Sequence, residues 1–189
     1  MNIFLSASVP LPDRNPSYFE TADVVAIRDS VKALVQTFAE HAVIHFGGHP
    51  AITPLISLML QRHPNVRSDR IRLYQSDYFA ERFPSENFSF VEQVVTPKVG
   101  NDRDESLALM RRKMLTDHPL SAAFFIGGME GVIDEYNLIK ELQPKAICYP
   151  VASTGGAALE VFQHGDFDPE LLTQLTYRTL FRRLLRGLS

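Results

Sequence analysis

The chain has 189 residues, of which 45% are hydrophobic and 22% charged, and its formal net charge is −3. This composition is typical of a soluble globular protein, and the length suits one domain over residues 1–189. The small negative charge, with scattered Lys and Arg, excludes the basic stripe that a nucleic-acid partner needs. One cysteine rules out a disulfide framework, and no apolar run is long enough to span a membrane, so we expect a cytoplasmic protein with no membrane partner.

Short apolar runs alternate along the chain with segments of helical period. This alternation predicts an α/β, Rossmann-like doubly wound sheet, mainly parallel and flanked by helices. The strands are expected at residues 3–7, 42–46, 70–74, 94–99, 122–126 and 145–149.

Helix start signals follow several of these runs. Ser17 and Glu20 have the spacing of a capping box, which predicts one long helix through residue 38. Asp102 and Asp104 are expected to begin another helix, and a further helix is expected at about 129–142. Asp168 is the expected N-cap of a C-terminal amphipathic helix at about 168–186.

Small or glycine-rich turns follow four of the predicted strands. In a parallel sheet, the loops after the strands gather at one edge, where ligands bind. We expect these turns to meet there and to bind a phosphate-bearing small molecule, because a glycine turn before a helix aims backbone N–H groups at an anion. The expected ligand-binding residues are Ser6, Ser8, Gly47, Gly48, His49, Gly127, Gly128, Met129, Glu130, Gly131, Ser153, Thr154, Gly155 and Gly156.

Other polar residues are candidates for the same site. One helical turn separates Gly131 from Glu135, so this carboxylate is expected to face a ligand at the helix N-terminus. Asp77, just after the third strand, lies where an acidic residue accepts hydrogen bonds from ribose hydroxyls. An aromatic side chain of residues 74–90 could stack on a base, although core packing is commoner for such residues. The dispersed histidines match no metal site, and we expect no metal and no cofactor.

Residues 43–50 (VIHFGGHP), 110–114 (MRRKM) and 127–135 (GGMEGVIDE) resemble the SLOG superfamily. This superfamily includes the Lonely Guy phosphoribohydrolases, also described as lysine decarboxylase-like, and nucleotide-sensing domains of bacterial conflict systems. The opening residues 4–10 (FLSASVP) and the Gly-Gly-His-Pro turn look more like the small prokaryotic SLOG families of conflict systems. The resemblance covers most of residues 3–160.

The phosphoribohydrolase motif is Pro-Gly-Gly-x-Gly-Thr-x-x-Glu, and this chain departs from it. Ile126 replaces the proline, one additional residue precedes Gly131, and Val132 replaces the threonine. With the insertion counted, Glu135 matches the catalytic glutamate of the family; without it, Asp134 does. The lost threonine hydroxyl removes one ligand of the phosphate.

The family also uses an arginine on the preceding helix. Spacing from the glycines favours Arg111 for this role, and the Arg-Lys pairing favours Arg112. The resemblance implies that Glu135 stabilises positive charge on the ribose or activates water, and that Arg111 holds a phosphate or polarises the leaving base.

Two functions remain open at this point. One is an enzyme that hydrolyses the N-glycosidic bond of a nucleotide or NAD-derived substrate, which the retained glutamate and arginine favour. The other is a non-catalytic sensor of a nucleotide-derived signal of the ADP-ribose type, acting with a separate effector, which the altered motif favours. In both, the partner is a nucleotide-derived small molecule, and the resemblance implies a homodimer or a higher homo-oligomer.

Overall fold

Six parallel strands form one sheet in the computed structural model, which describes residues 1–63 and 65–188. The strand order is β4-β3-β2-β1-β5-β6. The strands are β1 (Asn2–Ser8), β2 (Val43–Gly47), β3 (Ile71–Ser76), β4 (Glu92–Thr96), β5 (Ala122–Gly127) and β6 (Ile147–Val151). The predicted Rossmann-like α/β class is confirmed, and each expected strand is present, with bounds that differ by a few residues.

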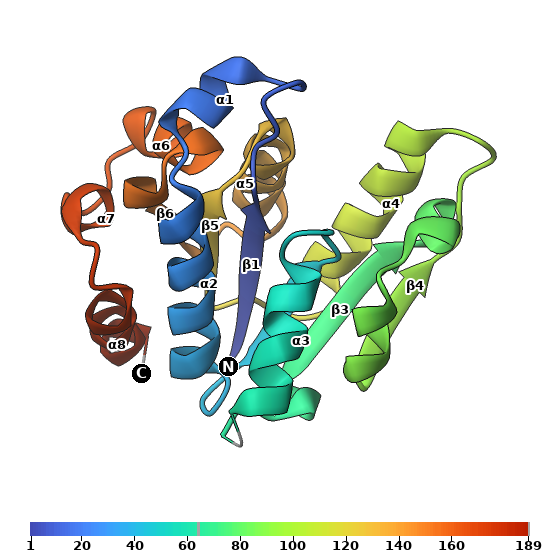
Figure 1. Cartoon of the computed structure of the whole chain (residues 1–189), viewed down its shortest axis with the longest axis horizontal. Coiled ribbons are helices and arrows are strands. Elements are labelled where there is room, and N and C mark those ends of the chain that lie inside the picture. The colour runs from blue at the N-terminus through green and yellow to red at the C-terminus, as the bar shows by residue number, and fades with distance from the viewer. Residues whose placement is uncertain (64, 189) are drawn as a thin grey trace.

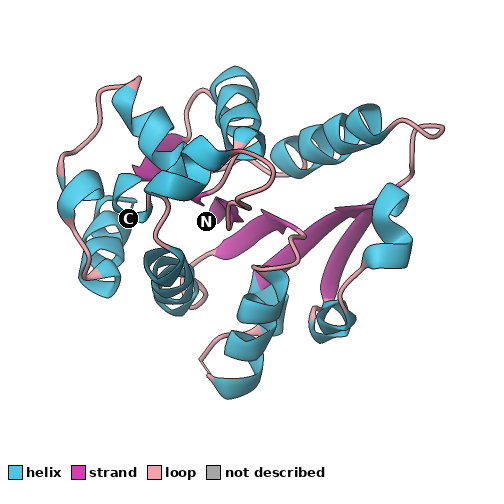
Figure 2. Ribbon diagram, turned by 45° about the horizontal axis from the view of Figure 1, so that its top comes forward, coloured by secondary structure: helices cyan, strands magenta, loops and turns pink. Residues whose placement is uncertain are grey.

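Helices cover both faces of the sheet (Figure 2). One face carries α2 (Val24–Phe38), α3 (Thr53–Arg62) and α8 (Tyr177–Leu188), and the other carries α4 (Arg103–Thr116), α5 (Glu130–Leu142) and α6 (Gly156–Gln163). Side chains alternate along a strand, so each strand supplies both apolar cores. In β1, Ile3 and Leu5 pack in the core beneath α2, whereas Phe4 packs in the core beneath α4 and α5.

Shorter elements complete the chain. They are α1 (Pro16–Thr21), α7 (Glu170–Thr173) and the 3-10 helices η1 (Ser68–Arg70), η2 (Asp77–Arg82), η3 (Ser85–Ser89) and η4 (Ala152–Thr154). Helix α1 lies across the end of the sheet toward which the strands point (Figure 1). No helix among the described residues has both the length and the apolar character that crossing a bilayer requires.

The prediction of one long helix that starts at Ser17 is wrong, because this segment forms two helices, α1 and α2. The Asn15 side chain caps α1 by accepting a hydrogen bond from the Ser17 N–H at 3.2 Å. Asp23 caps α2 by accepting from the Ala26 N–H at 2.9 Å. Two residues with strong N-cap preference therefore divide the segment, and Ser17 lies inside the first turn of α1.

The single helix predicted at 168–186 is also divided. Asp168 accepts a hydrogen bond from the Glu170 N–H at 2.9 Å, but the N-cap of α7 is Pro169 rather than the predicted Asp168, and α7 ends within one turn. Gln174 is extended there, and its side chain accepts a hydrogen bond from the Thr176 N–H at 3.0 Å. The local hydrogen bond to Gln174 holds this break between α7 and α8.

The direction of winding reverses between β1 and β5. From β1 the chain passes to α2 on one face, and from β5 it passes to α5 on the opposite face. Loops that leave adjacent strands toward opposite faces diverge, and the crevice between them is where open α/β sheets bind ligands. The register pairs Ser8 with Gly127 at this edge.

Candidate functional site

A cavity of about 410 Å³ opens at the crevice between β1 and β5. We call it the first cavity. Its walls include the following residues that were predicted from the sequence: Ser6, Ser8, Gly47, Gly48, His49, Arg111, Met129, Glu130, Gly131 and Glu135. Three of the four glycine-rich or small turns therefore meet around one space.

Gly127 and Gly128 support this cavity from the turn behind it. Both have positive φ (57° and 84°), and a Cβ on Gly127 would lie 2.4 Å from Cδ1 of Ile27, so the turn requires glycine there. The Gly128 N–H donates to the Ser8 carbonyl at 2.9 Å, and the Gly127 N–H donates to Thr154 Oγ1 at 2.8 Å. The N–H groups of Gly127 and Gly128 therefore donate to acceptors within the protein. The N–H groups that a ligand would meet lie further along the chain.

The fourth turn, at residues 153–156, lies outside the walls of the first cavity because α1 covers it. A Cβ on Gly155 would lie 1.8 Å from the Thr21 carbonyl oxygen, and the Gly156 N–H donates to Thr21 Oγ1 at 3.2 Å. Thr154 is fully buried, and Ser153 Oγ donates to the Gln174 carbonyl at 3.0 Å. These contacts fix the loop after β6 against α1, the β5 turn and the segment at Gln174.

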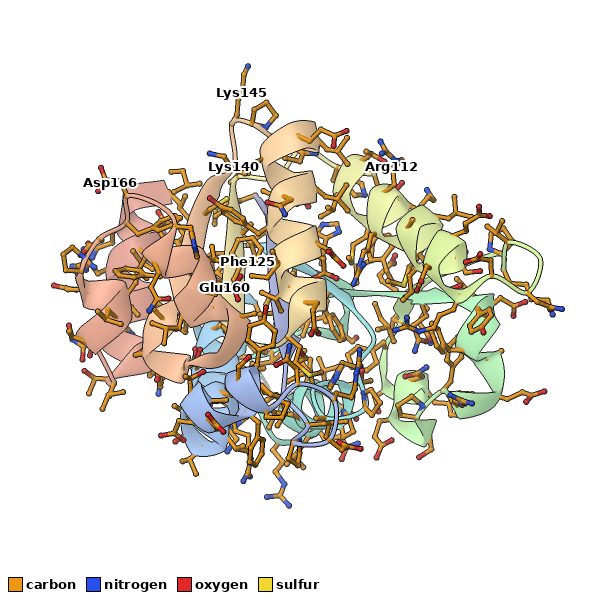
Figure 3. The ribbon with its side chains drawn as sticks, turned by 90° about the horizontal axis from the view of Figure 1, so that it is seen from above. Arg112, Phe125, Lys140, Lys145, Glu160 and Asp166 are labelled. Atoms are coloured by element: carbon orange, nitrogen blue, oxygen red, sulfur yellow. The ribbon has the colours of Figure 1, made fainter. Side chains whose placement is uncertain are left out.

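Two further candidates also lie away from the first cavity. Arg112 lies at the outer margin of α4 (Figure 3), and its guanidinium is 3.9 Å from the exposed carboxylate of Glu141. Asp77 is an exposed residue at the start of η2. Of the two arginines that the sequence left open, the structure places Arg111 at the cavity.

Glu135 lies at the inner wall of the first cavity with its side chain 15% exposed. Its Oε2 accepts a hydrogen bond from Ser6 Oγ at 2.5 Å, and its Oε1 is 3.4 Å from Arg111 Nε. Ser6 points toward α5 because it has the same parity along β1 as Phe4, whose side chain packs beneath α4 and α5. The alternative carboxylate, Asp134, is 56% exposed at the side of the helix.

The environment of Glu135 raises the pKa of its carboxyl group. Burial raises the pKa of this carboxyl, and the charge of Arg111 and the hydrogen bond from Ser6 lower it by a smaller amount. The net effect is a raised pKa, so Glu135 takes up a proton more readily than an exposed glutamate does.

Arg111 reaches from α4 across the first turns of α5. Its Nη1 is 3.0 Å from Asp134 Oδ2, and its Nε is buried without a hydrogen-bond partner. A Cβ on Gly131 would lie 2.8 Å from Arg111 Nη2. The absence of a side chain at Gly131 therefore lets the guanidinium lie against the start of the helix.

The N-terminus of α5 forms another part of the wall. Met129 precedes the helix in an extended conformation and provides no side-chain cap, and the first N–H groups of a helix have no partner within the helix. Glu130 Oε1 accepts a hydrogen bond from Asn15 Nδ2 at 2.7 Å. This bond lowers the pKa of Glu130, which stays ionised at neutral pH, so an anionic ligand also needs nearby cations.

Arg14 and Arg103 supply such cations and were not predicted from the sequence. Both line the first cavity, and no carboxylate lies within 4.0 Å of the Arg14 guanidinium in the described parts of the chain. Arg14 belongs to the proline-rich loop that crosses the sheet edge after β1. A cation in the loop directly after the first strand was the signal that could have identified it.

His49 is neutral in this setting. Burial, with a smaller contribution from the charge of Arg14, lowers its pKa to about 4. Its Nδ1 accepts a hydrogen bond from the Ala51 N–H at 3.2 Å, so the proton of the neutral ring is on Nε2. His49 can therefore donate one hydrogen bond without adding charge.

Metal binding has no support from side-chain clustering. Within residues 1–63 and 65–188, no group of three His, Cys, Asp or Glu side chains is arranged to hold a metal ion. That the protein needs no metal or cofactor stays a prediction.

The fold and site define a Rossmann-like α/β protein with a helix N-terminus that has no side-chain cap, an arginine and a buried carboxylate at the switch point of the sheet. The model of the SLOG cluster3 family matches residues 17–185, and the chain belongs to this family. The predicted membership of the SLOG superfamily is thereby confirmed, and it points to a nucleotide-derived ligand. No curated protein and no solved structure matches the chain significantly.

The raised pKa of Glu135 predicts a pH-dependent cost in stability. The folded protein binds this proton more readily than the unfolded chain, so stability falls as the pH rises through the raised pKa. Glu135→Gln removes the buried charge and is expected to raise the Tm at pH 7 to 8 by about 2–4 °C, which corresponds to about 1 kcal/mol in a domain of this size. The gain should vanish near pH 4, as measured by differential scanning calorimetry.

The matched control for this prediction is Glu141→Gln on the same helix, because the Glu141 side chain is 63% exposed. Its Tm should follow that of the wild type at every pH. A lower Tm for Glu135→Gln than for Glu141→Gln at pH 7 would mean that the contacts with Ser6 and Arg111 outweigh the cost of burial.

Proposed function

We propose that the protein binds a nucleotide-derived small molecule in the first cavity and hydrolyses its N-glycosidic bond. The observation that carries this proposal is the position of Glu135, a buried carboxylate that opens onto a cavity at the start of a helix. A raised pKa suits a group that takes or gives a proton near neutral pH.

The phosphate of the ligand would bind at the start of α5. Helix N-termini attract anions through their free N–H groups and dipole, and the residues Met129 to Gly131 line the cavity there. Arg111 lines the same cavity, and its flat guanidinium suits a phosphate oxygen. This arrangement would hold the sugar next to Glu135, one turn further along the helix.

In the proposed reaction, water adds to C1 of the ribose while the bond from C1 to the base nitrogen breaks. The electron pair of that bond leaves with the base, and one proton of the water ends on the base. Glu135 would accept the proton of the attacking water or stabilise the positive charge that develops on the ring. Ser6 and Arg111 would hold the carboxylate in place, because each contacts one of its oxygens.

A second candidate is a sensor that binds the same class of ligand without cleaving it. Two observations favour it: both oxygens of Glu135 already have protein partners, and Val132 stands where the phosphoribohydrolase motif has threonine. Val132 packs in the core beneath α5, so it gives the ligand no hydroxyl.

Product analysis separates the two candidates. The protein is incubated with AMP, NAD or ADP-ribose, and the products are separated by chromatography. The proposal predicts a free base, with ribose 5-phosphate as the other product from AMP and ADP-ribose as the other product from NAD, and a rate reduced about 10²- to 10⁴-fold in Glu135→Gln, the usual effect of losing a general base. Glu141→Gln, on the same helix, should keep the wild-type rate. Intact ligand recovered in stoichiometric amount would contradict hydrolysis and support the sensor.

Gly131→Ala tests the position of Arg111. The added Cβ would lie 2.8 Å from Arg111 Nη2, so the guanidinium must move away from the helix start. Binding of ribose 5-phosphate, measured by isothermal titration calorimetry, should weaken about 10-fold, as expected for losing a charge-assisted hydrogen bond. The variant should be as stable as the wild type, because alanine favours the helix. The displaced atom, Arg111 Nη2, lies at the end of a flexible side chain that can move away.

The control for this variant is Gly187→Ala in α8, where a new Cβ meets no atom within 4 Å. It should leave the affinity for ribose 5-phosphate unchanged. Equal affinities for the wild type and Gly131→Ala would show that Arg111 does not contact the phosphate.

A further inference from the structure

A second hollow, of about 420 Å³, adjoins the first cavity. It lies over the ends of β2 and β3, where Gly48, Gln75 and Ser76 form part of its walls. The two spaces share Arg14, Gly48, His49, Arg103, Leu107 and Met110. Each space alone has the size of a small-molecule site, about 300–1,000 Å³, so together they suit a ligand with two parts.

The second hollow differs from the first in its walls. Phe79, Phe83 and Pro84 line it from η2 and the residues that follow, and Leu11 lines it from the loop after β1. Phe79 and Phe83 are half-buried, which leaves part of each ring open to the hollow. Half-open aromatic rings are the surface on which a flat base stacks.

Polar groups in the second hollow are few. The Gln75 Oε1 accepts a hydrogen bond from Asn87 Nδ2 at 2.6 Å, whereas Gln75 Nε2 donates to no acceptor within the described residues. This nitrogen would lie 2.6 Å from a Cβ on Gly48, so the amide reaches the hollow only because Gly48 has no side chain. Apolar walls with one free amide donor match a heteroaromatic base, whose ring nitrogens accept hydrogen bonds.

Cations lie where the two spaces meet. Arg14 and Arg103 line both of them, and so does the neutral ring of His49, which has a proton to donate. Two guanidinium groups at a junction suit a pyrophosphate, which carries two adjacent charged groups.

We propose that the second hollow binds the base of a dinucleotide, whose pyrophosphate lies at Arg14 and Arg103 and whose other ribose lies at Glu135. This inference rests on the proposed function of the first cavity and specifies its substrate class. The scissile bond is then the one between the ribose at Glu135 and the base that it carries, and the adenosine half serves for binding.

The test compares two probes by isothermal titration calorimetry: ribose 5-phosphate, which fills the first cavity alone, and ADP-ribose, which reaches both. ADP-ribose should bind at least 10-fold more tightly, and Phe83→Ala should remove most of this difference without changing the affinity for ribose 5-phosphate, as expected for losing a stacked base. The control is Phe88→Ala in the same segment, because Phe88 is 93% exposed and lines neither space.

A second variant keeps the test decisive if Phe83→Ala does not fold. Arg82 is exposed and lines the second hollow, so Arg82→Ala should fold normally and weaken ADP-ribose binding about threefold. Equal affinities for the two probes, unchanged in Phe83→Ala and Arg82→Ala, would overturn the second hollow as a base site and leave the proposed function standing. No binding of either probe would overturn both.

Discussion

The reversal of winding between β1 and β5 is the constraint on which the rest of the site depends. Because α2 and α5 follow adjacent strands toward opposite faces, the connections that leave these two strands diverge, and the first cavity opens between them. The parity of β1 then turns Ser6 toward α5, and the helical period brings Glu135 beneath the helix start. The topology of the sheet, the pleat of β1 and the helical repeat of α5 thus place one carboxylate beside the N-terminus of α5.

The charged side chains of the site are partly buried, and their favourable contacts offset part of the free-energy cost of that burial. Glu135 is costly to bury, and Ser6 and Arg111 recover part of that cost. Arg111 in turn needs Gly131, because any side chain there would displace its guanidinium. These four residues act as a unit, so a change in one of them should alter the behaviour of the others.

The sequence predicted the strands, the class of fold and three of the turns at the site, because apolar runs and glycine turns are local signals. The predictions from sequence failed where contacts between distant parts of the chain determine the local structure. Asn15 and Asp23 divide a helix that the periodicity presented as one, and α1 covers the turn at 153–156. The choices between Arg111 and Arg112 and between Glu135 and Asp134 needed the packing of α4 on α5. Arg14 was missed because the path of its loop over the sheet edge depends on contacts distant in sequence.

A crystal structure of the Glu135→Gln variant with bound ADP-ribose would show directly whether the ligand binds between β1 and β5. We expect phosphate density at the N-terminus of α5, within hydrogen-bond distance of Arg111 or Arg14, and C1 of a ribose beside residue 135. Density for the phosphates over the turn at 153–156, or on a face of the protein away from β1 and β5, would contradict this expectation.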